Sequence, residues 1–196
     1  MTIRYVITRD IFSVRFGAFM LGNKKKSLLL SYTAVFIALI AAGSWVSVPV
    51  PPVPFTLQTM MVLLCAAVMK RYAVIPVMLY LVLGCLNLPV FHNGTAGIGI
   101  LLGPTGGYFI GFIFAALIAG YLYESEKTVM HVIGLILATI IILLSGTVWL
   151  VLSTGMTFMT AMIAGFIPFI IGDSIKLVLA FHIALWTRKI YPVWWD

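Results

Sequence analysis

The fold is decided by residues 128–172, which read TVMHVIGLILATIIILLSGTVWLVLSTGMTFMTAMIAGFIPFIIG and contain no Asp, Glu, Lys or Arg. A helix needs about 20 apolar residues to cross a bilayer, so this run has room for two spans. Two further uncharged runs, residues 28–69 and 72–123, have comparable length. The apolar residues are continuous and do not alternate with polar ones, which excludes a membrane β-barrel. The sequence therefore predicts an all-α integral membrane protein.

The composition supports the same class. Of the 196 residues, 63% are hydrophobic and 9% are charged, whereas soluble domains carry about 25% charged residues. A water-soluble fold of this size could not bury so much apolar surface. The lipid bilayer is therefore the expected solvent.

The placement of charge predicts the topology. The net charge is +7, which could indicate nucleic acid, but the basic residues other than Lys176 lie between or outside the predicted spans. The expected outer loops, near 49–55, 90–104 and 153–158, contain no charged residue. Basic residues are typically concentrated in the cytoplasmic loops of membrane proteins. We therefore expect six spans, both termini in the cytoplasm and no nucleic-acid partner. The basic residues concerned are Arg4, Arg9, Arg15, Lys24, Lys25, Lys26, Lys70, Arg71, Arg188 and Lys189.

The expected organisation is a basic cytoplasmic segment over 1–27, a six-helix domain over 28–190 and a tail over 191–196. Met1 and Met20 both remain possible starts. The second span is short, so the Pro-rich loop before it must dip toward the membrane or pack on other helices. Residues 158–166 form either a short helix or a re-entrant segment. The predicted spans are 28–48, 56–69, 72–89, 105–123, 129–152 and 167–187.

Asp173 and Lys176 are charged residues inside the last predicted span. Their i, i+3 spacing places both on one helix face, in the outer half of the membrane. A charge within a span costs about 2.5–3.5 kcal/mol on insertion scales, and such residues usually face a cavity. The pair is therefore either an ion pair that holds the bundle together or a polar site for a small ligand, a proton or an ion.

Two Gly-rich stretches, residues 93–99 and 103–108, lie on the same predicted outer side as Gln58. Glycines allow close approach of the backbone to a ligand or to another helix, and both interpretations remain open from the glycines alone. No Lys-Ser/Thr pair follows, which argues against a phosphate-binding loop. Because these polar features lie at one depth with the charged pair, we expect an outward-facing site.

Motifs for enzymatic chemistry and for metal binding are missing. There is no HExxH motif and no paired carboxylate, and His92, His131 and His182 are scattered. Cys65 and Cys85 lie in apolar runs as expected for buried thiols. We expect no enzymatic activity, no metal and no cofactor, so uphill transport would need an ion gradient or a partner ATPase.

In the first span, Ala34, Ala38 and Ala42 recur every four residues. Small residues at this spacing give a smooth face for close helix contact. That contact could be made within the bundle or with a separate membrane partner.

Four motifs in order resemble the BioY family, the biotin-binding S components of energy-coupling factor (ECF) transporters. They are Pro52–Gln58, Leu88–Phe91 leading to Gly94, Gly103–Tyr108 and Gly172–Lys176. The resemblance covers about residues 28–190. It implies six helices in the cell membrane, biotin captured near the outer face, and coupling to one transmembrane T component and two cytoplasmic ATPases.

The resemblance also implies roles for single residues. Asp173 and Lys176 would contact biotin, and Ala34 and Ala38 would contact the T component. The Gly-rich loop would add polar contacts, although some members carry Asn where this chain has Thr95.

The alternative hypothesis is a proton-coupled secondary transporter of a small carboxylated solute, with Asp173 as the proton carrier. The complete predicted substrate site is Gln58, Asn93, Gly94, Thr95, Tyr108, Asp173 and Lys176.

Overall fold

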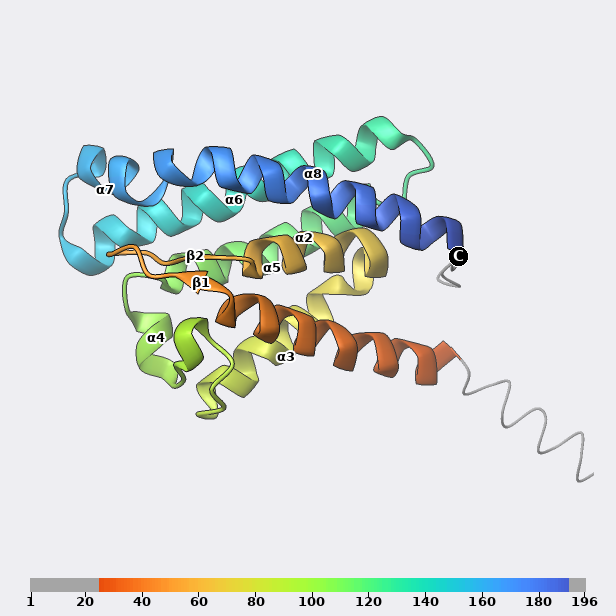
Figure 1. Ribbon diagram of the computed structural model, residues 1–196, viewed down its shortest axis with the longest axis horizontal. Helices are drawn as coiled ribbons and strands as arrows, with labels where there is room; N and C mark the ends of the chain where they lie inside the picture. The colour runs from red at the N-terminus through yellow and green to blue at the C-terminus, as the bar shows by residue number, and fades with distance from the viewer. Residues whose placement is uncertain (1–24, 191–196) are drawn as a thin grey trace, which may run out of the picture.

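The computed structural model describes residues 25–190 (Figure 1). Most of the predicted basic segment, including Met20, and the predicted tail lie outside the described residues. The helix Lys25–Trp45 comes first. The elements that follow are β1 (Ser47–Val48), β2 (Phe55–Thr56), α2 (Gln58–Met69), the 3-10 turn η1 (Lys70–Ala73), α3 (Val74–Cys85), the 3-10 turn η2 (His92–Gly94), α4 (Ile98–Leu102), α5 (Gly106–Leu122), α6 (Thr128–Thr154), α7 (Phe158–Gly165) and α8 (Ile167–Ile190).

The predicted class, an all-helical membrane protein, is confirmed. Four continuous helical segments among the described residues are long and apolar enough to cross a membrane, and Gly106–Leu122 is a shorter apolar helix. One of the four, Gln58–Cys85, reverses direction at Lys70, whose φ is 53°, so that α2 and α3 run as separate helices (Figure 1). The four segments are Lys25–Trp45, Gln58–Cys85, Thr128–Thr154 and Phe158–Lys189.

The helices lie in layers around α2 (Figure 1). Helices α6 and α8 form one side, α2 and α5 lie in the middle, and α3 and the helix Lys25–Trp45 form the other side. Helix α2 is buried almost throughout, with Val62, Cys65 and Ala66 fully inaccessible. A short helix that contacts its neighbours on every side can carry polar groups into the protein interior without exposing them to lipid.

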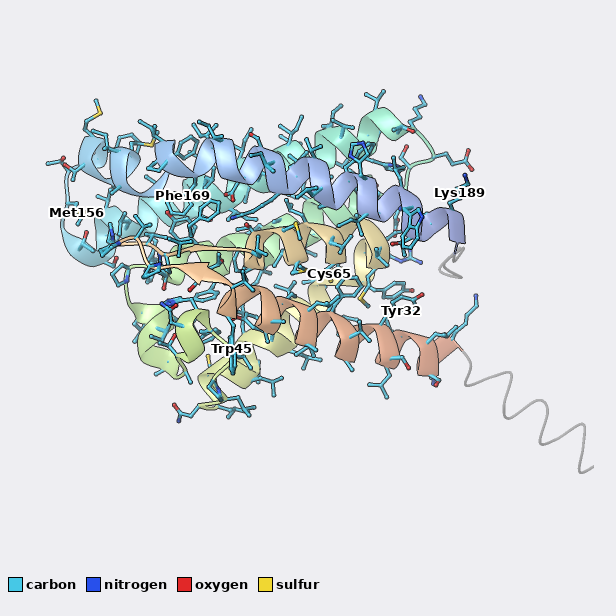
Figure 2. All side chains as sticks on the ribbon, in the orientation of Figure 1. Tyr32, Trp45, Cys65, Met156, Phe169 and Lys189 are labelled. Carbon is cyan, nitrogen blue, oxygen red and sulfur yellow. The ribbon has the colours of Figure 1, made fainter. Side chains whose placement is uncertain are left out.

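The two ends of the molecule differ in content. One end holds β1, β2, α4 and α7, and we call it the hairpin end (Figure 1). The other holds η1, the α5–α6 loop and both limits of the described chain, and Figure 2 places Met156 and Lys189 at these opposite ends. Because the first and last described residues lie at the same end, the arrangement fits an even number of membrane crossings. The charge pattern predicts that the hairpin end faces outward.

The Pro-rich loop folds as a small hairpin that packs on the bundle. Strands β1 and β2 pair antiparallel with Ser47 opposite Thr56 and Val48 opposite Phe55. Phe55 stacks on Phe169 of α8 with ring centroids 5.8 Å apart, and Figure 2 shows Phe169 beside the hairpin. The chain therefore packs on other elements here, and the two-residue strands are an addition to the all-α prediction.

The second Gly-rich stretch brings α5 against α6. A Cβ on Gly107 would lie 2.2 Å from Trp149 Cβ and 2.3 Å from the Ser145 carbonyl oxygen. Trp149 Nε1 donates to the Gly103 carbonyl at 2.9 Å. Helix packing thus accounts for these glycines. The stretch predicted as a short helix or re-entrant segment forms the short helix α7 (Phe158–Gly165), whose first turn is capped by Thr157 through the Thr160 amide at 3.3 Å.

Candidate ligand-binding site

The buried ion pair on α8 is the chemical centre of the site. Asp173 and Lys176 are 2% and 4% exposed, and Lys176 Nζ lies 2.8 Å from Asp173 Oδ1. Thr59 on α2 joins them: its hydroxyl accepts from Lys176 Nζ at 3.2 Å and donates to Asp173 Oδ1 at 3.3 Å. Lys176 Nζ also lies 3.6 Å from the centroid of the Phe55 ring. The cluster therefore presents a cation and an anion side by side.

This cluster lines a cavity among the hairpin, α2, α5, α6 and α8. The space not filled by atoms, including the part that opens to solvent, is about 440 Å³. Aromatic and aliphatic side chains make up much of the wall. The lining residues are Val53, Pro54, Thr56, Gln58, Thr59, His92, Thr105, Tyr108, Phe109, Phe112, Leu143, Phe169, Asp173 and Lys176.

The structure brings four of the predicted site residues to this cavity: Gln58, Tyr108, Asp173 and Lys176. Gln58 Nε2 donates to the Tyr80 hydroxyl at 2.6 Å. The Tyr108 hydroxyl donates to the Gly165 carbonyl at 2.6 Å. Both side chains are thus held in place by hydrogen bonds within the protein.

The other three predicted residues, Asn93, Gly94 and Thr95, lie in or next to η2 and are not among the lining residues. The Asn93 side-chain oxygen accepts a hydrogen bond from the Ser47 hydroxyl of β1. The Thr95 hydroxyl donates to the His92 carbonyl at 2.7 Å. In this arrangement the two side chains shape the loop beside the cavity.

Several lining residues are not part of the sequence prediction. Thr59 follows Gln58 directly and could have been considered with it. His92 precedes Asn93, but no other potential metal ligand at a suitable spacing distinguishes it in the sequence. Phe109, Phe112 and Phe169 lie in apolar spans, where no sequence signal separates a cavity wall from a lipid-facing ring.

Ala34 and Ala38 are exposed in the described structure. The opposite face of the same helix is buried, with Thr33 and Phe36 each 4% exposed and Ile40 fully covered. Within residues 25–190, therefore, the alanine face does not pack inside the bundle.

Among the described residues, no group of three or more His, Cys, Asp or Glu side chains could hold a metal ion. The chemistry that the cavity offers is hydrogen bonding, ion pairing and apolar contact.

Comparison with known proteins gives consistent matches. The family model of the BioY family matches residues 16–193. The chain is 40% identical over 157 residues to the biotin transporter BioY of Thermotoga maritima, covering 80% of this chain and 93% of that protein. It is 38% identical over 160 residues to the probable biotin transporter BioY of Pyrococcus horikoshii, covering 81% and 95%.

A solved structure has the same fold. It is the crystal structure of the S-component for biotin from an ECF-type ABC transporter. It aligns with a TM-score of 0.79 at 29% sequence identity, covering 85% of this chain and 94% of that one.

Proposed function

This chain belongs to the BioY family, and on that premise we propose that it is the biotin-binding S component of an ECF transporter. The observation that carries the proposal is the apolar cavity with the buried Asp173–Lys176–Thr59 cluster in its wall. The family is one of transport subunits, so the chain is not an enzyme.

The cavity suits the parts of biotin. The ureido ring carries N–H donors and one carbonyl acceptor, which match Asp173 as acceptor and Lys176 as donor. Charge-assisted hydrogen bonds of this kind are strong in a site shielded from water. Phe109, Phe112 and Phe169 would cover the apolar thiophane ring and the aliphatic chain. An ion pair that only held helices together would have no need to line a cavity.

The proposed partners follow from the premise and from the surface of the first described helix. In the proposal, the exposed face at Ala34 and Ala38 contacts a transmembrane T component. Two cytoplasmic ATPases supply the energy. Biotin enters at the hairpin end from outside the plasma membrane, and both termini lie in the cytoplasm.

The alternative, a proton-coupled secondary transporter, relies on Asp173 alternately gaining and losing a proton. Asp173 Oδ1 instead accepts from the Lys176 ammonium at 2.8 Å and from Thr59 at 3.3 Å. Two donors to the same oxygen stabilise the ionised carboxylate and so oppose the protonation that a proton carrier requires. We therefore do not favour the alternative.

The proposal is tested by titrating the detergent-purified full chain with biotin, using Trp fluorescence, without ATP and without an ion gradient. We expect saturable binding of biotin and none of an unrelated vitamin such as thiamine. Failure to bind biotin would contradict the proposal. Accumulation of biotin in liposomes that hold this chain alone, driven by a pH gradient, would favour the secondary transporter.

A further inference from the structure

His92 differs from the other polar side chains of the cavity wall because it has no protein partner. Both ring nitrogens are shielded from solvent, and neither has a hydrogen-bond partner. By contrast, Gln58, Tyr108 and Thr105 donate to protein acceptors, and the Asp173 cluster is internally bonded. Buried polar groups rarely lack a hydrogen-bond partner in folded proteins. The two His92 ring nitrogens are therefore available to hydrogen-bond with another molecule.

The position of His92 is fixed from both sides along the chain. Phe91 is fully buried, and its ring packs against Gly84 so closely that a Cβ there would lie 2.0 Å from the ring. On the other side, the Thr95 amide and hydroxyl both donate to the His92 carbonyl, at 3.1 and 2.7 Å. The backbone that carries the imidazole is therefore held before any ligand arrives.

Burial lowers the pKa of the His92 imidazole from its ordinary value, which favours the neutral form. A neutral imidazole has one N–H donor and one acceptor nitrogen. It can therefore donate to a ligand oxygen without adding a buried charge to the cavity wall.

We propose that the His92 N–H donates to the carboxylate of bound biotin, while the Asp173–Lys176–Thr59 cluster takes the ureido ring. This inference rests on the proposed function. The cluster offers both a donor and an acceptor, as a ureido group requires. A carboxylate only accepts, and it would be repelled by Asp173 beside Lys176.

The location of His92 supports this orientation. It lies in the segment between α3 and α4, at the hairpin end, and the residue as a whole is only half-buried. Asp173 and Lys176 are nearly inaccessible. An ionised carboxylate is costly to bury without a hydrogen-bond donor, and the unpartnered His92 ring can supply one. The carboxylate end of the ligand therefore belongs beside His92.

The test compares biotin with biotin methyl ester on the full chain and on His92→Phe, which removes the hydrogen bond but keeps an aromatic ring. Hydrogen bonds to charged groups contribute more than neutral ones, so we expect the variant to lose about tenfold or more in affinity for biotin. The loss for the ester should be clearly smaller. His92→Gln, which keeps an N–H donor, should retain more biotin affinity than His92→Phe.

The matched control is His182→Phe, because His182 is exposed on α8 and does not line the cavity. Equal losses for biotin and ester would place His92 against another part of the ligand and overturn the carboxylate assignment. Unchanged affinity would overturn the contact itself while leaving the proposed function intact. If the unaltered chain binds no biotin, the proposed function fails instead. His92→Leu provides the same comparison should phenylalanine disturb folding.

Discussion

The Lys176 ammonium lies 3.6 Å from the centroid of the Phe55 ring, so the β1–β2 hairpin covers the ion pair of α8. The ring supplies a cation–π contact on one side of Nζ, while Asp173 and Thr59 accept its hydrogen bonds. Phe55 also stacks on Phe169, which lines the cavity. One aromatic residue thus links the hairpin to both the polar and the apolar walls of the site.

Phe55→Leu should weaken biotin binding. A cation–π contact contributes about 0.5–2 kcal/mol, which corresponds to a factor of about two to thirty in Kd. The measurement is a biotin titration of the purified variant. Phe158→Leu, at an exposed position of α7, is the matched control and should bind normally. An unaltered Kd for Phe55→Leu would show that the ring does not support the bound state.

Asp173→Asn and Lys176→Met should each abolish biotin binding, but they should differ from the double variant in stability. Lys176→Met leaves a buried carboxylate without its cation, which costs about 3–5 kcal/mol. The double variant Asp173→Leu/Lys176→Met removes both charges and should recover much of that stability without recovering binding. Thermal unfolding and biotin titration of the three proteins separate these effects. Normal binding by the double variant would mean that the pair is only structural.

The six-helix arrangement could be predicted because it depends on properties that extend over many residues. The uncharged runs set the number of spans, while the orientation that the loop charges indicate stays a prediction. The reversal at Lys70 falls where Lys70 and Arg71 separate the uncharged runs 28–69 and 72–123. The β1–β2 hairpin could not be predicted, since two-residue strands have no periodicity to detect.

The candidate site was only partly predictable. Asp173 and Lys176 are conspicuous because ionised side chains are rare inside spans. Asn93 and Thr95 are polar residues in a Gly-rich loop, but local hydrogen bonds to Ser47 and to the His92 backbone keep them from the cavity wall. His92, between them and the buried Phe91, lines the cavity instead. Which side chains of this loop line the cavity depends on the loop geometry, and composition and spacing do not specify that geometry.

Ala34→Trp and Ala38→Trp should leave biotin binding unchanged but abolish biotin uptake by the assembled transporter. Both alanines are exposed and distant from the lining residues in sequence, and a large ring would prevent close contact with a partner helix. Binding is measured on the purified chain, and uptake in cells that supply the T component and ATPases. Val35→Trp, on the same helix at a position 53% exposed, is the control. Full uptake by both alanine variants would contradict the proposed interface.

Arg188 joins three elements at the end of the molecule opposite the cavity. Its Nη2 donates to the Ala67 carbonyl of α2 at 3.2 Å and to the Tyr123 carbonyl after α5 at 3.1 Å. The guanidinium carbon lies 4.8 Å from the centroid of the Tyr123 ring, and that ring stacks on His131 of α6. A single basic residue of α8 is therefore bonded to the neighbouring helices at their ends.

Arg188→Ala should lower the free energy of unfolding by about 1.5–3 kcal/mol, because it removes charge-assisted hydrogen bonds and leaves carbonyl acceptors without their donor. Arg188→Lys should restore only part of this, since an ammonium lacks the planar fork that reaches two carbonyls. The measurement is thermal unfolding in detergent, with Lys189→Ala at the neighbouring exposed position as the control. Biotin affinity should remain unchanged, because the cavity contains no residue of this cluster. A variant with normal stability and weakened biotin binding would instead indicate that the two ends of α8 are coupled.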